Sequence, residues 1–227
     1  LHLLRQAGSS GANQTNLKQE AHPVNTSRLL LPGCLSAMIF ITGCAGVGQQ
    51  VQAGRTALQT GRPSDAVGHL MRAAELDPNY TTHHKLRMSV LTYLGRAYYE
   101  TGKDAEALNT LEKAVAKNRD DHLAHLYLGL TRLRYGRPED SRKEVEGGLE
   151  GIHGWLEYIA SDSFYGIYWD PGRQIRSDIE KTLAGKLNAS ELAVAAQRIG
   201  RELDQELDRA RKDESYSRYG RGGGGGD

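Results

Sequence analysis

Histidine and acidic side chains gather at one point in the middle of the chain. His122 and His125 are three residues apart, which would place both rings on one face of a helix. Asp120 and Asp121 directly precede them. Imidazole and carboxylate groups together can bind a metal ion, although the same pattern is typical of the solvated beginning of a helix. We therefore predict no metal site and no cofactor.

A second set of reactive residues lies nearer the C-terminus. Residues 161–172 form the densest aromatic cluster of the chain, with four aromatic side chains within 164–169. Together with His153 and Asp170, this loop could belong to an enzyme or to a module that binds cell wall or carbohydrate. Such clusters also pack between secondary-structure elements. No recognisable nucleophile or paired-carboxylate motif accompanies the loop, so we predict no catalytic residue and keep this module as an alternative.

The thiol of Cys44 is the third reactive group. Arg28 precedes a mostly apolar run at 29–41, whose length suits a signal peptide and falls short of a membrane span. The run ends in Ile41-Thr-Gly-Cys44. This tetrapeptide resembles the lipobox of bacterial lipoproteins, in which small residues admit the signal peptidase and the cysteine thiol attacks the lipid donor. Ala45 in the next position is similar to the pattern of lipoproteins sent on to the outer membrane.

The resemblance implies an N-terminal address instead of a folded element. Residues 1–43 would be a disordered leader followed by a signal peptide, and residues 44–49 a lipidated tether that starts at Cys44. The protein would then face the periplasm of the bacterial envelope, with the outer membrane favoured over the inner one. The alternative is that 29–41 is a structural helix of a cytosolic adaptor.

The elements that must position these groups are helices, and they repeat. Small side chains are needed where two antiparallel helices approach closely, and Gly102 suits the turn between them. The pattern recurs upstream around Gly54 and, more weakly, downstream around Gly129, which lies 34 residues after Gly95. In the middle copy it reads Leu94-Gly95-x-x-Tyr98, Gly102 and Ala107-x-x-x-Leu111-x-x-Ala114.

This pattern resembles the tetratricopeptide repeat, whose period is 34 residues. The resemblance implies an all-α fold, a solenoid of helical hairpins with about three repeats at 47–80, 88–121 and 122–155, in an array over 50–150. One hairpin cannot bury its apolar face alone, so the repeats must stack. The extra residues at 81–87 are expected to lengthen the first helix of the second repeat by about two turns.

In this family the first helix of each hairpin lines a concave groove that binds protein or peptide ligands. Several arginines lie at positions that would face such a ligand, where they could meet carboxylates. The leucine row that includes Leu130 could instead be core beneath the C-terminal helices. The predicted groove residues are Arg55, Leu58, Thr92, Arg96, Tyr99, Leu130 and Arg134.

Beyond the repeats we predict a C-terminal helical cap over residues 151–212, which includes the aromatic loop at 161–172. Apolar residues at helical spacing predict a long helix after Ser190, which is a suitable N-cap. The opposite face of this helix is charged, as expected of an element that closes a solenoid. Residues 213–227 contain a glycine run and are expected to form a disordered tail.

Composition narrows the classes of function. The chain has 29 Lys and Arg residues against 28 Asp and Glu residues, so no overall field attracts nucleic acid. The leading hypothesis is a non-catalytic scaffold for protein–protein interactions that is lipid-anchored in the envelope and helps to assemble an envelope complex. A cell-wall or carbohydrate module and a cytosolic adaptor are the alternatives. The sequence is compatible with a monomer and with a dimer.

Overall fold

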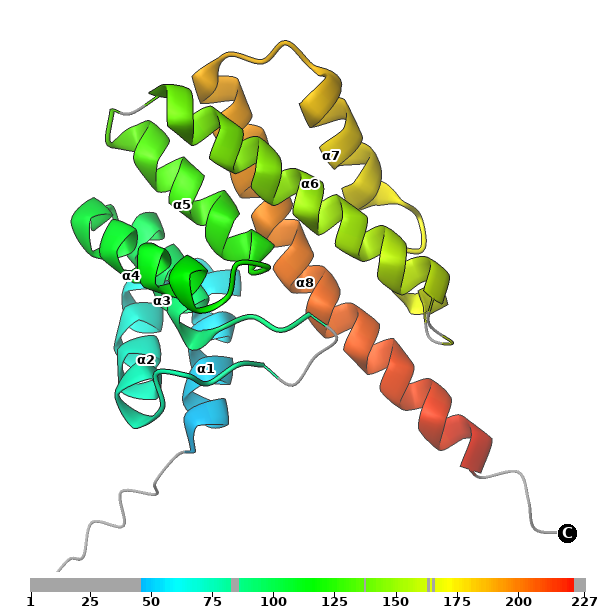
Figure 1. Cartoon of the computed structure of the whole chain (residues 1–227). Helices are drawn as coiled ribbons and strands as arrows, with labels where there is room; N and C mark the ends of the chain where they lie inside the picture. The colour runs from blue at the N-terminus through cyan, green and yellow to red at the C-terminus, as the bar shows by residue number, and fades with distance from the viewer. Residues whose placement is uncertain (1–45, 83–85, 137, 163, 165, 223–227) are drawn as a thin grey trace, which may run out of the picture. The chain divides into compact units, whose positions relative to one another are not determined.

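The chain folds into α-helices that pack in consecutive pairs (Figure 1). A computed structural model describes residues 46–82, 86–136, 138–162, 164 and 166–222. The predicted leader, signal peptide and Cys44 lie outside this part of the chain. The pairing of the helices confirms the predicted all-α solenoid of hairpins. The elements are α1 (Val47–Gln59), α2 (Pro63–Leu76), α3 (Val90–Glu100), α4 (Asp104–Lys117), α5 (His122–Arg134), α6 (Pro138–Asp162), the 3-10 helix η1 (Gly166–Tyr168), α7 (Gln174–Ala184) and α8 (Ala189–Gly222).

Three glycines hold equivalent places in the three successive hairpins. At each one, the second helix of the hairpin comes so close that a β-carbon would overlap with one of its side chains. The glycine spacing along the sequence therefore reflects one repeated helix-to-helix distance. An added Cβ would lie 2.5 Å from Cγ of Leu70 at Gly54, 2.4 Å from Cγ of Leu111 at Gly95, and 2.7 Å from Cγ2 of Val145 at Gly129.

The turn inside each hairpin repeats as well. Gly61, Gly102 and Gly136 have φ angles of 72°, 75° and 86°. This left-handed region strains residues that carry a β-carbon and is open to glycine. In each case the second helix of the hairpin begins two residues later. The third hairpin, whose sequence matches the repeat pattern only weakly, thus keeps the same turn.

The extra residues at 81–87 do not lengthen a helix, so that expectation is wrong. Thr81 and Ser89 form an isolated antiparallel bridge, and α3 begins only at Val90. The hydroxyl oxygen of Ser89 accepts a hydrogen bond of 3.1 Å from the backbone N–H of Thr92 and caps α3. A capping residue marks the point where a helix begins. Leu86 in the loop is fully buried, so the insertion adds to the core.

Helix α8 packs against α5, α6 and α7 and reaches α1, so it does more than close the last hairpin (Figure 1). Its N-cap is Asn188 and not Ser190, because Oδ1 of Asn188 accepts from the backbone N–H groups of Ser190 and Glu191 at 3.0 Å each. The carboxylate of Glu191 accepts from the Asn188 N–H in return, as in a capping box. One face of α8 is almost fully buried, and it consists of Leu192, Ala196, Ile199, Leu203, Leu207 and Ala210.

The sequence predicts a disordered tail from residue 213, but α8 continues to Gly222. Contacts at the beginning of this stretch support the helix. Arg209 and Asp213 form an i,i+4 ion pair of 2.7 Å, and the indole N–H of Trp169 donates to Glu214 at 2.6 Å. Despite the length of α8, no helix in the described ranges is both long and apolar enough to cross a lipid bilayer.

The close approach at Gly95 yields a stability prediction. Gly95→Ala should lower the free energy of unfolding by about 1–3 kcal/mol, because the new methyl group overlaps with Leu111. Gly68→Ala in α2 is the matched control, since an added Cβ there has no atom within 4 Å. This control should raise the free energy of unfolding by roughly 0.5–1 kcal/mol. Urea titrations followed by circular dichroism measure both values, and equal effects of the two substitutions would contradict the packing.

Candidate functional site: the concave face and helix α8

The predicted groove residues lie on the first helices of the hairpins, and α8 lies over that face (Figure 1). Arg134 is exposed, and the other six are buried. These six are therefore not open to solvent, and an external ligand at their side chains would have to replace part of the chain itself. The buried residues are Arg55, Leu58, Thr92, Arg96, Tyr99 and Leu130.

The carboxylate of Asp204 on α8 is the centre of the contact with this face. Arg55 of α1 donates through Nε and Nη2 to Oδ1 of Asp204, at 3.0 Å and 2.8 Å. Nη1 of Arg96, from α3, lies 3.3 Å from Oδ2 of the same carboxylate. All three side chains are at most 1% exposed. Because charges buried this deeply must be paired, the contact fixes where α8 lies on the array.

Two further acids complete the pairing. Nη1 of Arg55 donates to Asp208, one turn after Asp204 on α8, at 2.9 Å. Nε of Arg96 donates to Glu100, one turn later on α3, at 2.8 Å. The two guanidinium groups and three carboxylates form one network between the hairpins and α8, which we call the arginine network.

The repeat itself builds the arginine pair. Arg55 and Arg96 each follow the close-packing glycine of their hairpin by one residue, and a tyrosine precedes the equivalent glycine of the next hairpin by two. Each guanidinium consequently lies over a ring of the next repeat. The distance to the ring centroid is 5.4 Å from Arg55 to Tyr93 and 5.5 Å from Arg96 to Tyr127. Cation–π attraction is favourable at such distances.

Burial has opposite effects on the pKa of the arginine and of the tyrosine in each cation–π pair. It works to lower the pKa of Arg55 and of Arg96, whereas the adjacent tyrosine and the Asp204 carboxylate raise it, and the net pKa of both arginines is raised. Burial raises the pKa of Tyr93 and of Tyr127. The two arginines therefore stay charged and the two tyrosines stay neutral across physiological pH.

Other predicted groove residues make contacts within the array. The hydroxyl of Thr92 donates to Oδ2 of Asp121 at 2.5 Å, which joins the second hairpin to the start of the third. The guanidinium of Arg134 lies 4.0 Å from the ring centroid of Tyr99, donates to the Tyr99 carbonyl at 2.7 Å and pairs with Asp104. These side chains thus connect neighbouring repeats.

The histidine pair at the start of α5 has other partners. Nδ1 of His125 lies 3.2 Å from Oε1 of Glu144, and Nε2 lies 3.1 Å from the carbonyl oxygen of Arg119. The hydrogen bond with Glu144 raises the pKa of His125, while burial lowers the pKa of His122. Both ring nitrogens of His125 are in use, so this ring joins α5 to α6.

The aromatic loop contributes to packing through its buried members. Trp169 is 1% exposed. The buried carboxylate of Asp170 accepts from the backbone N–H groups of Ile175 and Arg176, at 3.1 Å each, and so caps the first turn of α7. The alternative enzyme site pairs Asp170 with His153, but the ring of His153 contacts Glu180 of α7 instead.

Sequence reasoning missed Asp204 and the role of the two tyrosines. Asp204 lies beside the apolar row of the last helix, directly after Leu203, but Asp208 follows Leu207 in the same way, so the spacing alone does not single out Asp204. An acid on the buried face of an amphipathic helix requires a buried cation opposite it. The arginines at equivalent repeat positions were the cations available, but the sequence does not say that the last helix folds back onto them.

Comparison with known proteins supports the repeat assignment. Residues 95–136, which run from α3 to the turn after α5, match the family model described as TPR repeat. TPR repeat-containing protein YpiA of Bacillus subtilis (strain 168) is 28% identical over 131 residues, which are 55% of this chain and 29% of that protein. The chain therefore spans less than a third of that relative. No solved structure matches this chain significantly. These matches support a protein with tetratricopeptide repeats, an all-α fold that is typically a non-catalytic scaffold.

The arginine network predicts a large effect of one substitution. Asp204→Ala should lower the free energy of unfolding by about 3–5 kcal/mol, because two buried guanidinium groups lose their shared partner. Asp213→Ala is the control on the same helix, where the partly exposed pair with Arg209 contributes roughly 0.3–0.5 kcal/mol. Guanidinium chloride unfolding measures both. A loss below about 1 kcal/mol for Asp204→Ala would mean that α8 does not depend on this carboxylate.

Proposed function

We propose that this chain, which carries tetratricopeptide repeats, is a non-catalytic scaffold for protein–protein interactions in the bacterial envelope. A lipid on Cys44 would hold it on the periplasmic side, in the outer membrane in preference to the inner one. Its ligand would be a protein or peptide, and it would assist assembly of an envelope complex. The observation that carries the proposal is that the concave face already holds a helix, α8, through residues of three hairpins.

The lipid anchor rests on the sequence before α1. The apolar run at 29–41 and the Ile41-Thr-Gly-Cys44 junction have the length and residue types of a lipoprotein signal. Helix α1 begins at Val47, three residues after Cys44. A lipid on Cys44 would therefore be joined to the array by a very short tether.

The chemistry of α8 indicates what kind of partner the concave face would accept. It is an amphipathic helix with apolar residues at helical spacing and the fully buried carboxylate of Asp204 among them. A partner helix with the same features could replace α8 and still pair Arg55 and Arg96. A helix without the carboxylate would leave two buried cations unpaired, which disfavours it by several kcal/mol. We therefore expect helix-in-groove recognition that requires an acid on the apolar face.

A partner helix that replaces α8 has to compete with a segment that is covalently attached to the same chain. A tethered segment competes at an effective concentration in the millimolar range when its linker is short, so an external helix starts at a disadvantage. Weakening the hold of α8 without changing the groove side chains should reduce that disadvantage. Asp204→Asn does this, because the substitution removes the charge from α8 and leaves both arginines in place.

Metabolic labelling with palmitate checks the anchor. In a bacterial host, the full-length chain should take up label and sediment with membranes, whereas Cys44→Ser should lose both properties because the acylated thiol is absent. Cys34→Ser is the matched control. Cys34 lies inside the apolar run, so this variant keeps Cys44 and should still take up the label. A chain that takes up no label in any form would instead support the cytosolic adaptor.

A synthetic peptide that spans residues 189–217 checks the groove. Labelled with a fluorophore, it should bind the Asp204→Asn chain at least about tenfold more tightly than the wild-type chain in anisotropy titrations, because the resident helix is held less firmly. A peptide with asparagine in place of the acid is the control and should bind more weakly than the acidic peptide. If both peptides bound equally well, Arg55 and Arg96 would not contribute to recognition of the helix.

A further inference from the structure

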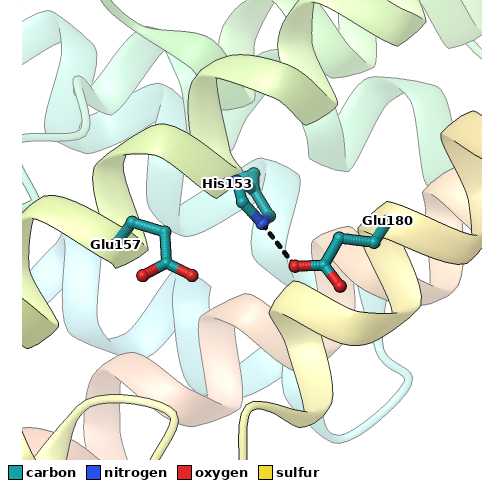
Figure 2. A group of neighbouring side chains, drawn as sticks. All are labelled: His153, Glu157 and Glu180. Atoms are coloured by element: carbon teal, nitrogen blue, oxygen red, sulfur yellow. Dashed lines mark hydrogen bonds and ion pairs between the residues drawn. The ribbon is translucent and has the colours of Figure 1, made fainter.

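Three potential metal ligands converge between α6 and α7, away from the groove. His153 and Glu157 are four residues apart on α6, so both side chains leave the same face of that helix. Glu180 of α7 faces them (Figure 2). One ligand atom from each residue can be chosen so that all lie within 4.8 Å of one another, and Nε2 of His153 is 3.0 Å from Oε1 of Glu180.

A cation already occupies the point where these groups meet. The guanidinium of Arg173 lies 2.8 Å from Oε1 of Glu157 and 3.1 Å from Oε1 of Glu180. Its side chain is about half exposed, at 53%, so it can leave for solvent without opening the core. The position therefore favours positive charge, and its present occupant is the most exposed of the four side chains.

The second nearby cation is held elsewhere. Arg176 is buried, and its Nε donates to Asp170 at 3.0 Å while its Nη2 donates to the Asp170 carbonyl oxygen at 2.8 Å. Towards the cluster it contacts only the other carboxylate oxygen of Glu157, at 3.2 Å. If Arg173 moves away, Oε1 of Glu157, Oε1 of Glu180 and Nε2 of His153 are left facing one another.

We propose that these three atoms bind one Zn²⁺ ion, which takes the place of the Arg173 guanidinium. Zinc accepts both imidazole nitrogens and carboxylate oxygens as ligands, at about 2.0–2.2 Å, in a four-coordinate site that water can complete. Ligand atoms in such a site are about 3.3 Å apart. The 3.0 Å between His153 and Glu180 is already suitable, and Glu157, whose ligand atom lies within 4.8 Å of the other two, would have to move closer by a change of its side chain. The ion would join α6 to α7. This site is independent of the proposed function.

Zinc binding changes the protonation of His153. The hydrogen bond of Nε2 with the Glu180 carboxylate requires the proton on Nε2, whereas the metal requires the lone pair of that nitrogen. The proton must therefore move to Nδ1 or, from a doubly protonated ring, be released to solvent.

Isothermal titration calorimetry of the full chain with ZnCl₂ tests the site. The wild-type chain should bind one ion and gain thermal stability on binding. His153→Ala should weaken binding at least about tenfold. His69→Ala is the control, since that ring contacts Gln50 in the first hairpin and should leave zinc binding unchanged. MgCl₂ should bind far more weakly, because Mg²⁺ prefers an all-oxygen octahedral site.

Arg173→Gly separates a metal site from an ion-pair cluster. This substitution removes the competing cation and also suits the left-handed backbone at position 173, where φ is 53°. If Arg173 stands in for the metal, the variant should bind Zn²⁺ about fivefold or more tightly than the wild-type chain. Absence of binding by the folded wild-type chain would overturn the proposal, and so would equal binding by His153→Ala.

Discussion

One buried carboxylate determines how the last helix relates to the repeats. Asp204 has no exposed surface, and the guanidinium groups of Arg55 and Arg96 are almost as deeply buried. None of these charges is stable in the interior alone, because each loses its hydration on burial. Apolar contacts along α8 would tolerate some sliding or rotation of the helix, whereas the carboxylate has one position that pairs both cations. The arginine network thus adds specificity of position to the stability supplied by the leucines.

The two buried arginines of the arginine network are placed by the repeat geometry. In the first two hairpins an arginine follows the close-packing glycine by one residue. In the second and third hairpins a tyrosine precedes that glycine by two residues. Each guanidinium group therefore lies over the tyrosine ring of the next hairpin, on the concave face. The third hairpin has Leu130 where the first two have arginine. Consequently the charged part of the concave face ends there, and the apolar residues of α8 pack against α5 beyond it.

Sequence reasoning predicted the features that depend on local repetition. The hairpin turns and the helix approach follow from Gly102 and Gly95, because only glycine fits those positions and the spacing recurs. The path of α8 depends on a contact between residues 149 positions apart, and no local pattern specifies it. The segment at 81–87 was misread although a local signal was present, because Ser89 is a preferred N-cap residue and marks the start of α3 at Val90.

Because Arg55 and Arg96 are buried, they would select a ligand in a different way from exposed arginines. An exposed arginine would attract any acidic peptide through a long-range field that salt screens. Arg55 and Arg96 instead lie beneath a helix, in a place where salt and water do not compensate them. A helix that replaced α8, as proposed above, would therefore have to place its own carboxylate in the apolar interior, within reach of both cations. That requirement would exclude ordinary apolar helices, which lack the charge, and ordinary acidic segments, which lack the apolar face.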